Sequence, residues 1–478
     1  MVKDDLLMAW RVAEAVQKAG GRVYYVGGFV RDRLLGRENK DIDIEVHGVS
    51  VKTLEGILDS LGERLTMGAS FGVMGLRHYD LDIAMPRSET ATGRGHKDFE
   101  VFVDPFLGEE KAAMRRDFTI NALMENVLTG EILDFFGGQE DLERRRIRHV
   151  NDQSFAEDPL RVFRACQFAA RFQFSVAPET MALCSSMSVD ALAKERILGE
   201  MEKALLKATH PSVFFEELRK MRQLSYWFPE LEALIGLEQN ARYHPEGDVW
   251  THTMQVLDEA AKLRCDAKEP LWFMLSALCH DFGKAVTTEE KDGVIHAYEH
   301  ETAGLPLVER FLSRVANEVK LKDYVLNMTR MHMIPNILAV NTKSAKKFMK
   351  MFDRSVCPGD LLLLAKADHL GRRTPETGSE VLLREYQPIE ELLRSRLAEY
   401  ERLMENPPIM GRDLIEAGMT PGPVFTEALA YAHKLHLAGI SKETALRQTL
   451  GMYHKSERTE KYDTGRDAAS GSGDTAED

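Results

Sequence analysis

The sequence is poor in cysteine and has no long apolar run. Its five cysteines among 478 residues are scattered and form no C-x-x-C pair. That pattern is typical of free thiols in a reducing compartment and excludes a disulfide-stabilised scaffold. No apolar stretch approaches the roughly 20 residues that span a bilayer, and the N-terminus lacks a signal-peptide core. We therefore predict a cytoplasmic protein with no membrane partner.

An excess of positive charge is also missing. The chain has 76 acidic and 62 basic residues, a net charge of −14. This balance disfavours a protein that coats nucleic acid non-specifically, although one local basic face can still bind RNA. With 44% hydrophobic and 29% charged residues, the composition is that of an ordinary globular protein.

The local patterns change near residue 140. Before it, strand-like runs such as RVYYVGG and DIDIEV alternate with helical segments, which predicts a small mixed sheet. After it, helical periodicity continues to about residue 453, so we expect an α+β protein. The predicted parts are a head (1–140), a helical neck and body (141–235), an all-α domain (236–400), a helical C-terminal region (401–454) and a disordered tail (455–478).

Two acidic residues share one face of a predicted strand. Asp41 and Asp43 alternate with apolar residues, so their carboxylates point the same way, about 7 Å apart. Carboxylates placed in this way can hold two Mg²⁺ ions for in-line displacement at phosphorus. An acidic strand facing solvent gives the same pattern, and Asp80 and Asp82 form a second copy of it.

A glycine turn upstream favours the first copy as the catalytic pair. Gly27 and Gly28 end a strand and precede a helix, where backbone N–H groups can approach a phosphate. Arg31 in the first turn of that helix is within reach of a triphosphate. A glycine pair alone predicts only a turn, but GG-x-x-RD-x-x-LG followed by D-x-D is far more specific.

The segment YVGGFVRDRLLGRENKDIDIEV resembles the head of the class II tRNA nucleotidyltransferase and poly(A) polymerase family, within the polymerase-β superfamily. The motifs RRDFTINAL, FFGGQEDLERRRIR, EDPLRVFRACQFAARF and KERILGEMEKAL follow in the family's order. The resemblance implies a polymerase-β-like head, a neck and body that select the nucleotide and bind RNA, and a flexible loop in PRSETATGRGHKDFEVFVDPF. In RRDFTINAL it implies triphosphate contacts from Arg115 and Arg116 and ribose contacts from Asp117 and Asn121.

Asp158 and Arg161 offer a base-selecting pair. At i and i+3 they are expected to share a helix face. A carboxylate accepts hydrogen bonds and a guanidinium donates them, which suits the edges of cytosine and adenine and rejects uracil and guanine. A surface salt bridge is the alternative, but the position behind a complete head favours selection. Arg164, on the same predicted helix, is expected to bind nucleotide too.

Histidine and aspartate recur in order through the helical second half of the chain. A single helical histidine is more often a core or surface residue, but an ordered set suits a borderline transition metal. The set resembles that of the HD phosphohydrolase superfamily. By this resemblance, the ligands of a first metal such as Ni²⁺ or Mn²⁺ are His252, His280, Asp281 and Asp368. His300 and His332 would then bind a second metal or a phosphate.

Together these features predict template-independent addition of CCA to tRNA 3′ ends from CTP and ATP. The resemblance implies a second activity of the HD domain on 2′,3′-cyclic phosphates or nucleoside phosphates. A poly(A) polymerase and an A-only or CC-only adding enzyme remain open alternatives. An HD phosphohydrolase whose head only binds nucleotide or RNA is an alternative of another class. The chain is expected to act as a monomer or a homodimer.

Overall fold

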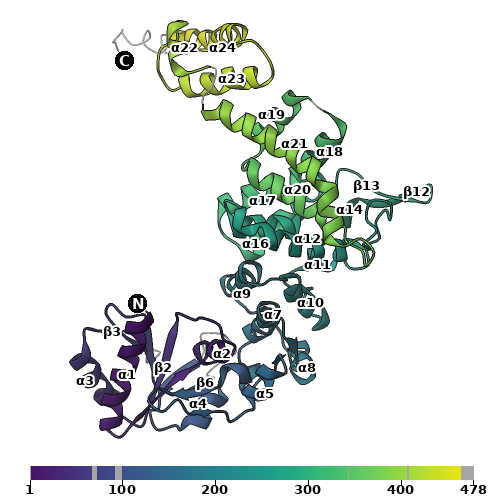
Figure 1. The fold of residues 1–478 in the computed structure, drawn as a ribbon. Helices are drawn as coiled ribbons and strands as arrows, with labels where there is room; N and C mark the ends of the chain where they lie inside the picture. Colours follow the sequence, from purple (N-terminus) through teal and green to yellow (C-terminus); the bar gives the residue numbers. More distant parts are fainter. Residues whose placement is uncertain (1, 67–72, 92–98, 343, 406–408, 464–478) are drawn as a thin grey trace, which may run out of the picture. The chain divides into compact units, whose positions relative to one another are not determined.

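The chain divides into two units, each described here by itself (Figure 1). The computed structural model describes residues 2–66, 73–91, 99–342, 344–405 and 409–463. The first unit comprises residues 1–235 and 310–317, and the second comprises residues 236–309 and 318–478.

The first unit begins with a seven-stranded mixed sheet of order β3-β4-β5-β2-β1-β8-β9. Its strands are β1 (Arg22–Val26), β2 (Ile42–His47), β3 (Arg64–Thr66), β4 (Val73–Leu76), β5 (Leu81–Ala84), β8 (Met124–Asn126) and β9 (Ile132–Leu133). β2 pairs parallel with β5 and antiparallel with β1. The strand that carries the predicted catalytic pair therefore lies inside the sheet, as the expected mixed topology requires.

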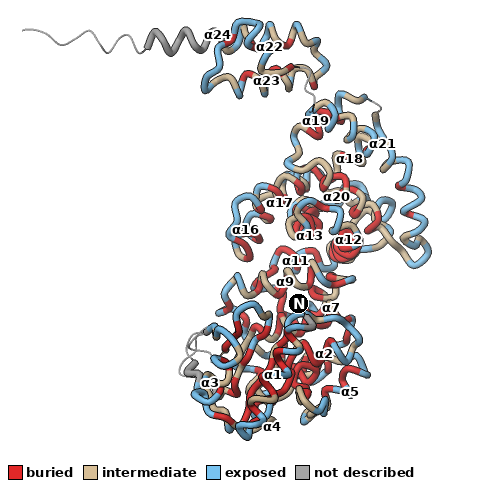
Figure 2. The backbone as a smooth tube through the Cα atoms, turned by 60° about the vertical axis from the view of Figure 1, so that its left-hand side comes forward, coloured by how far each residue is buried: buried red, intermediate tan, exposed pale blue. Residues whose placement is uncertain are grey.

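Short helices complete the head. They are α1 (Val2–Lys18), α2 (Gly28–Leu34), α3 (Val51–Leu61), α4 (Glu109–Met114) and the 3₁₀ turn η1 (Thr119–Asn121). α1 buries Met8, Val12 and Val16 at helical spacing and packs on β1. Many of the buried residues of the head lie around α1 (Figure 2).

The segment expected to be a flexible loop contains a hairpin instead of wholly irregular chain. β6 (Arg87–Ala91) pairs antiparallel with β7 (Phe99–Val103), with Arg87 opposite Val103. The alternating EVFV run favours this pairing because its β-branched and aromatic residues suit a strand. Residues 92–98 of the expected loop lie outside the described residues.

Helices follow the head within the first unit. They are α5 (Gly138–Glu143), α6 (Asp152–Ala156), α7 (Leu160–Phe172), α8 (Pro178–Ser186), α9 (Lys194–Lys207), α10 (Ser212–Lys220) and α11 (Pro229–Glu232), with a two-stranded parallel pair, β10 (Arg146–Ile147) and β11 (Ser175–Val176). α7 packs against both α9 and α10. Phe163, Phe214 and Phe228 are fully buried, and their ring contacts form the core of this region.

The second unit is helical apart from one hairpin, within its described residues. Its elements are α12 (Val249–Leu263), η2 (Arg264–Asp266), α13 (Pro270–Cys279), α14 (Lys284–Thr287), β12 (Thr288–Lys291), β13 (Val294–Ala297), α15 (His300–Ala303), α17 (Val319–Met331), α18 (Ile334–Asn341), α19 (Ala345–Arg354), α20 (Pro358–Leu370) and α21 (Ser379–Glu405). α16 (Leu305–Val315) falls across the division between the units. α12 packs against α13 and α20, so three of the predicted metal ligands lie on helices that contact one another or at their ends.

The chain ends in α22 (Gly411–Glu416), α23 (Phe425–Leu437) and α24 (Lys442–Asp463). Small buried clusters hold these helices together, one of them around Ile409, Ala432 and Ala445. The expected disordered tail is wrong in part, because α24 continues to Asp463. KSERTEKYD contains good helix formers that can extend a helix already begun by packed residues. Residues 464–478 lie outside the described residues. Among the described helices, none has both the length and the apolar content needed to cross a bilayer.

Candidate active sites

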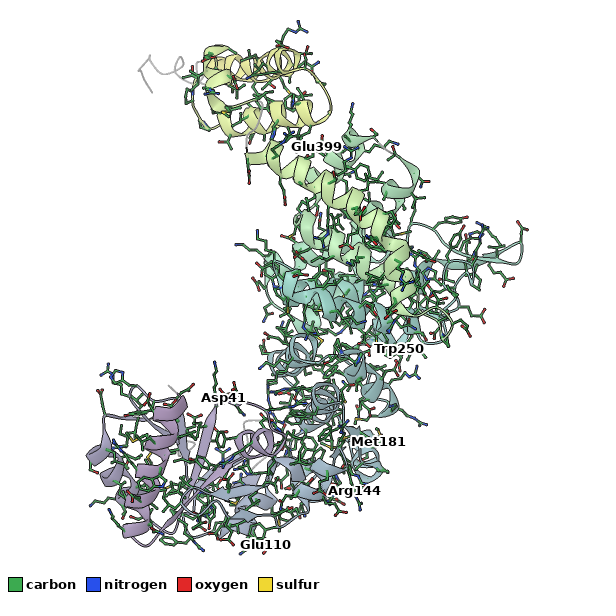
Figure 3. All side chains as sticks on the ribbon, viewed as in Figure 1. Asp41, Glu110, Arg144, Met181, Trp250 and Glu399 are labelled. Atoms are coloured by element: carbon green, nitrogen blue, oxygen red, sulfur yellow. The ribbon has the colours of Figure 1, made fainter. Side chains whose placement is uncertain are left out.

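Polar residues alternate along one face of β2, and they become more buried from the start of the strand to its end. Asp41 is exposed directly before the strand (Figure 3), Asp43 is half-buried, and Glu45 and His47 are buried. Glu45 Oε1 lies 2.8 Å from His47 Nε2, and its other oxygen lies 3.4 Å from Arg116 Nη2. The continued alternation D-x-D-x-E-x-H was visible in the sequence, but the part of Glu45 in anchoring Arg116 was missed.

A third carboxylate faces the pair. In the parallel register of β2 and β5, Asp43 stands opposite Asp82. Burial and the charges of Asp82 and Asp41, partly offset by the charge of Arg116, raise the pKa of Asp43 to about 6. Carboxylates that repel one another in this way form a ready site for a divalent cation, which replaces the repulsion with attraction.

The glycine turn lies beside these carboxylates. Gly27 has a φ of +68°, a left-handed conformation that favours glycine. A Cβ added to it would lie 3.1 Å from Arg116 Nη1 and 3.9 Å from Asp43 Oδ2. The turn, Arg116 and the predicted catalytic carboxylate of Asp43 thus lie close together.

Four predicted nucleotide-binding residues form one buried network. Arg31 is only 4% exposed and donates to Asn121 Oδ1 at 2.6 Å. Asn121 Nδ2 donates to Asp117 Oδ1 at 2.9 Å, and Arg164 Nε donates to Asp117 Oδ2 at 2.8 Å. Arg31 also pairs with Asp32, and its guanidinium lies 4.6 Å from the centroid of the Phe172 ring. Through these hydrogen bonds the network joins α2 to η1 and α7.

The base-selecting pair is held by residues that sequence reasoning did not single out. α7 starts at Leu160, so Asp158 precedes the helix, and the expected shared helix face is wrong. The Asp158 carboxylate accepts from Arg196 Nη2 of α9 at 3.0 Å. Arg161 donates to the carbonyl oxygens of Ser154 and Arg115 at 2.7 and 2.8 Å. The Arg115 side chain reaches the carbonyl oxygen of Arg87.

In the second unit, the predicted histidines and aspartates converge on one buried cluster. His252 Nε2 lies 3.2 Å from Asp368 Oδ1 and 3.4 Å from His280 Nε2. Asp281 lies at the centre. Its Oδ2 is 3.2 Å from His280 Nε2, and its Oδ1 is 3.1 Å from His300 Nε2 and 3.8 Å from His332 Nε2. All six predicted ligands are thus brought together, with Asp281 between two groups.

The Nδ1 atom of each of these histidines contacts an acceptor away from the cluster. His280, His300 and His332 donate to the carbonyl oxygens of Ala277, Ala297 and Thr329 at 2.7–2.9 Å. A carbonyl can only accept, so Nδ1 carries the proton and Nε2 presents its lone pair. Burial and the neighbouring His280 lower the pKa of His332 to about 3, which keeps that ring neutral.

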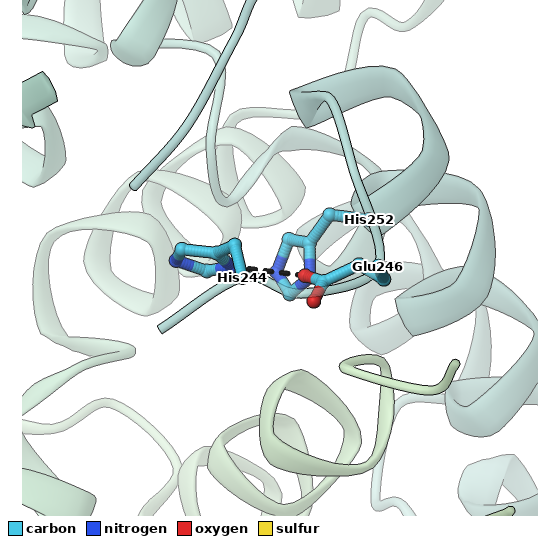
Figure 4. A group of neighbouring side chains, drawn as sticks. All are labelled: His244, Glu246 and His252. Atoms are coloured by element: carbon cyan, nitrogen blue, oxygen red, sulfur yellow. Dashed lines mark hydrogen bonds and ion pairs between the residues drawn. The ribbon is translucent and has the colours of Figure 1, made fainter. Parts of the chain in front are cut away.

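Glu246 performs the same anchoring for His252, and sequence reasoning missed it (Figure 4). Its Oε1 lies 2.7 Å from His252 Nδ1 and 2.9 Å from His244 Nδ1, and its side chain is fully buried. Burial would raise the pKa of Glu246, but the hydrogen bonds from the two rings lower it to about 2. The signal in the sequence was an acidic residue in HPEGDVWTH, shortly before a predicted metal ligand.

The donor set fits divalent cations. The Nε2 atoms of the four histidines lie 3.1–3.8 Å from the carboxylates of Asp281 and Asp368. Lone pairs and carboxylate oxygens repel one another at these distances unless a cation or protons lie between them. Besides these histidines, the buried Asp281 carboxylate contacts Lys284, whose Nζ lies 2.7 Å from Oδ2. His252, His280 and Asp281 could hold one ion, and Asp281, His300 and His332 a second.

Comparisons with known proteins match both parts of the chain that carry the predicted sites. Residues 23–148 match the Poly A polymerase head domain family, and residues 249–373 match the HD domain family. Residues 173–235 match a family described as a probable RNA and SrmB-binding site of polymerase A. The Multifunctional CCA protein of Nitrosococcus oceani is 39% identical over 358 residues, which cover 73% of this chain and 85% of that protein.

The chain belongs to the family of multifunctional CCA proteins. Another member, from Alkalilimnicola ehrlichii, is 38% identical over 362 residues, covering 73% of this chain and 84% of that protein. The two segments with the predicted catalytic residues match the two family domains separately, so this family combines a nucleotidyltransferase head with an HD domain in one chain.

Solved structures share the fold. The CCA-adding enzyme of Bacillus stearothermophilus in complex with CTP has a TM-score of 0.62 at 20% identity, covering 95% of this chain and 99% of that chain. The Thermotoga maritima CCA-adding enzyme complexed with tRNA has a TM-score of 0.60 at 20% identity, covering 94% of this chain and 98% of that one. The expected polymerase-β-like head followed by helical domains is therefore confirmed.

Proposed function

We propose that the head adds CCA to the 3′ end of tRNA from CTP and ATP. The observation that carries this proposal is the meeting of Asp43, Asp82, Arg116 and the Gly27 turn in a chain of the multifunctional CCA protein family. Relatives named as CCA-adding enzymes, solved with CTP and with tRNA, support the choice of substrates.

The roles of the head residues follow from this geometry. Asp41 and Asp43 would hold Mg²⁺, which would supply positive charge to the attacking hydroxyl and to the triphosphate. Arg115 and Arg116 bind the triphosphate beside the turn of Gly27 and Gly28, with Glu45 holding the Arg116 guanidinium. Asp117 and Asn121 border the ribose, and the nucleotide-binding residues Arg31 and Arg164 also hydrogen-bond to them.

Asp158 and Arg161 read the base without a nucleic-acid template. The Asp158 carboxylate accepts from the amino group of cytosine or adenine, and Arg161 donates to the adjacent ring nitrogen. Arg196 orients the carboxylate by its ion pair. Uracil and guanine present a carbonyl and a ring N–H in these places, so they leave both protein groups unpaired.

We propose a second function, a metal-dependent phosphohydrolase in the HD domain. The observation that favours it is the set of histidines whose Nδ1 atoms are anchored and whose Nε2 atoms converge on Asp281. Such imidazole-rich sites suit Ni²⁺ or Mn²⁺, and a bound metal supplies an activated water to a phosphoester. Lys284, with Nζ 2.7 Å from Asp281 Oδ2, is placed to attract the phosphate.

One experiment tests the head. A tRNA transcript ending at the discriminator base, at C or at CC is incubated with the protein, Mg²⁺ and CTP, ATP or both, and its ends are resolved to one nucleotide. Stepwise addition that stops at CCA supports the proposal. A CC end, a single A or a long A tail identifies a CC-only, an A-only or a poly(A) enzyme instead. No incorporation, with phosphate release under Ni²⁺, would leave the head as a binding module.

None of the five cysteines, all of which the structure describes, forms a disulfide, and this supports a cytoplasmic location. The proposed stoichiometry is a monomer or a homodimer, which light scattering of the full chain distinguishes.

A further inference from the structure

Two residues of the GG-x-x-RD-x-x-LG motif, Asp32 and Gly36, have no part in the proposed transfer reaction. Gly36 follows α2 with a φ of +66°, and its N–H donates to the carbonyl oxygen of Arg33 at 3.0 Å. The next N–H, that of Arg37, donates to the carbonyl oxygen of Asp32 at 2.8 Å. These two bonds form a Schellman motif, which ends the helix and turns the chain. The residues after Gly36 are thereby directed back toward α2.

Asn39, three residues after this turn, joins α2 to the start of β2. Its Nδ2 donates to Asp32 Oδ2 at 2.9 Å, and its Oδ1 accepts from the Asp41 N–H at 3.0 Å. A Cβ added to Gly28 would lie 3.6 Å from Asn39 Nδ2, so the amide also lies close to the glycine turn. A carboxylate only accepts and a backbone N–H only donates. A side-chain amide satisfies both partners because it has a donor and an acceptor.

Asp32 is itself fixed by the buried network of the head. Its Oδ1 accepts from Arg31 Nε at 2.8 Å, and both side chains are 5% exposed. Arg31 in turn donates to Asn121, one of the residues proposed to border the ribose. A continuous series of hydrogen bonds therefore runs from the proposed nucleotide-binding residues through Asn39 to the backbone of Asp41.

The two proposed metal-binding aspartates differ in what holds their backbone. Asp43 lies within β2, in register with Asp82 of the neighbouring strand. β2 begins at Ile42, so Asp41 precedes the strand, and it is exposed. Mg²⁺ requires near-ideal octahedral geometry, so a carboxylate that is free to shift binds it poorly. Asp41 therefore depends on a support outside the strand, and Asn39 supplies one at its N–H.

We propose that Asn39 is a positioning residue for nucleotide transfer, which sets the Asp41 carboxylate relative to the glycine turn. The inference rests on the proposed nucleotidyltransferase function of the head. Asn39 acts through Asp41 and touches neither substrate. Its loss should therefore affect the metal site and the rate of transfer more than the binding of CTP.

The first test is the transfer of CMP to a tRNA that ends at its discriminator base. Asn39→Ala should lower kcat roughly 10–100-fold, the cost of a displacement of about 1 Å at a reacting centre, with KM for CTP changed about twofold or less. Asn39→Asp should lower kcat about tenfold or more, because it places a second carboxylate against Asp32. The double variant D32N/N39D exchanges donor and acceptor and can form all the bonds again. It should recover about tenfold in kcat over Asn39→Asp alone.

Metal binding gives a readout that does not depend on turnover. The full chain is first loaded with Ni²⁺ to fill the HD cluster. It is then titrated with Mn²⁺ in the presence of a CTP analogue with a methylene group between the α- and β-phosphorus atoms, and free Mn²⁺ is measured by electron paramagnetic resonance. Asn39→Ala should weaken Mn²⁺ binding about tenfold, and D32N/N39D should bind it about as tightly as the wild type.

Asn126→Ala is the matched control. The Asn126 side chain also accepts from backbone N–H groups, those of Leu128 and Thr129 at 3.0 Å, but it does so in the turn after β8. This variant should leave both kcat and the affinity for Mn²⁺ unchanged. A general loss of stability from removing an asparagine of this kind would appear in both variants.

The outcomes separate the positioning role from the proposed function. Transfer by the wild type that Asn39→Ala does not lower, or lowers without weakening Mn²⁺ binding, overturns the positioning role and leaves the transferase intact. A loss that D32N/N39D does not recover also overturns it. No transfer by the wild type, with Mn²⁺ binding that Asn39→Ala weakens and D32N/N39D restores, supports the positioning role and overturns the transferase. Neither transfer nor such a difference in Mn²⁺ binding overturns both.

Discussion

The carboxylates of the head lie on a strand that grades from exposed to buried, whereas the histidines of the HD cluster are at most 5% exposed. In the head, Asp43 and Asp82 repel one another with Arg116 as the nearest compensating cation. In the HD cluster, each Nδ1 is already anchored, so the Nε2 lone pairs are oriented before a metal binds.

This contrast indicates two kinds of metal site. Hard carboxylate ligands on an open strand suit Mg²⁺, which binds reversibly and keeps several waters. Oriented imidazoles in a buried cluster suit a tightly held transition metal, because less entropy is lost when the metal binds. The first metal is expected to exchange with each turnover, and the second to remain with the protein.

The largest effect should come from Asp43→Asn. Loss of one metal-binding carboxylate should lower nucleotide transfer to tRNA by roughly a thousandfold or more, since metal charge stabilisation is worth several kcal/mol. Hydrolysis of a cyclic phosphodiester under Ni²⁺ should be unchanged, because the HD cluster belongs to the other unit. Parallel loss of both activities would break the separation of the two sites.

Glu246→Gln should act on the HD metal alone. Without the carboxylate that contacts His252 Nδ1, the affinity for Ni²⁺ should fall about 10–100-fold. Competition with a chromogenic chelator measures this affinity directly, without an activity assay. Glu290→Gln on exposed β12 is the control, and equal affinities for the two variants would contradict the anchoring role.

Arg196→Ala should relax base selection in the head. Arg196 Nη2 lies 3.0 Å from Asp158 Oδ2, and this ion pair orients the carboxylate. Without it, discrimination of CTP over UTP should fall roughly tenfold. The measurement is the ratio of kcat/KM values for the two nucleotides on one tRNA end. Lys203→Ala is the control. Lys203 lies on the same helix but pairs with Glu200, so its loss should leave the ratio unchanged.

The smallest effect concerns stability. Because the pKa of Asp43 is raised to about 6 in the folded protein, its ionised form destabilises the metal-free fold above that pH. A shift of about two units corresponds to about 3 kcal/mol, so Asp43→Asn should raise the Tm by a few degrees at pH 7.5 in EDTA. The gain should shrink as the pH falls from 7.5 to 5, where wild-type Asp43 becomes protonated. A gain that is constant with pH would contradict this origin.

The sequence was enough to name candidate site residues. Asp41 and Asp43 followed from strand alternation and the glycine turn upstream, and the six candidate HD ligands followed from the resemblance to the HD superfamily. The structure brings both sets together, and the family comparisons support both functions.

The residues that hold these groups were much harder to foresee. Arg196 reaches Asp158 from another helix, and Glu45 anchors Arg116 across 71 positions. Such contacts depend on tertiary packing, which local patterns do not encode. The spacing of Asp158 and Arg161 predicts one helix for both, but α7 begins at Leu160, directly after Pro159, a residue that suits a helix start. The polar composition of residues 455–478 predicts disorder, although α24 extends to Asp463.

The most direct test of the two-metal contrast starts from protein dialysed against EDTA. Only MgCl₂ is returned, together with CTP, ATP and a tRNA that ends at its discriminator base, and hydrolysis of adenosine 2′,3′-cyclic phosphate is followed in the same sample. We predict stepwise addition of C, C and A with no hydrolysis until Ni²⁺ or Mn²⁺ is supplied. Recovery of both activities with Mg²⁺ alone, or CCA addition only after Ni²⁺, would contradict this assignment of the two sites.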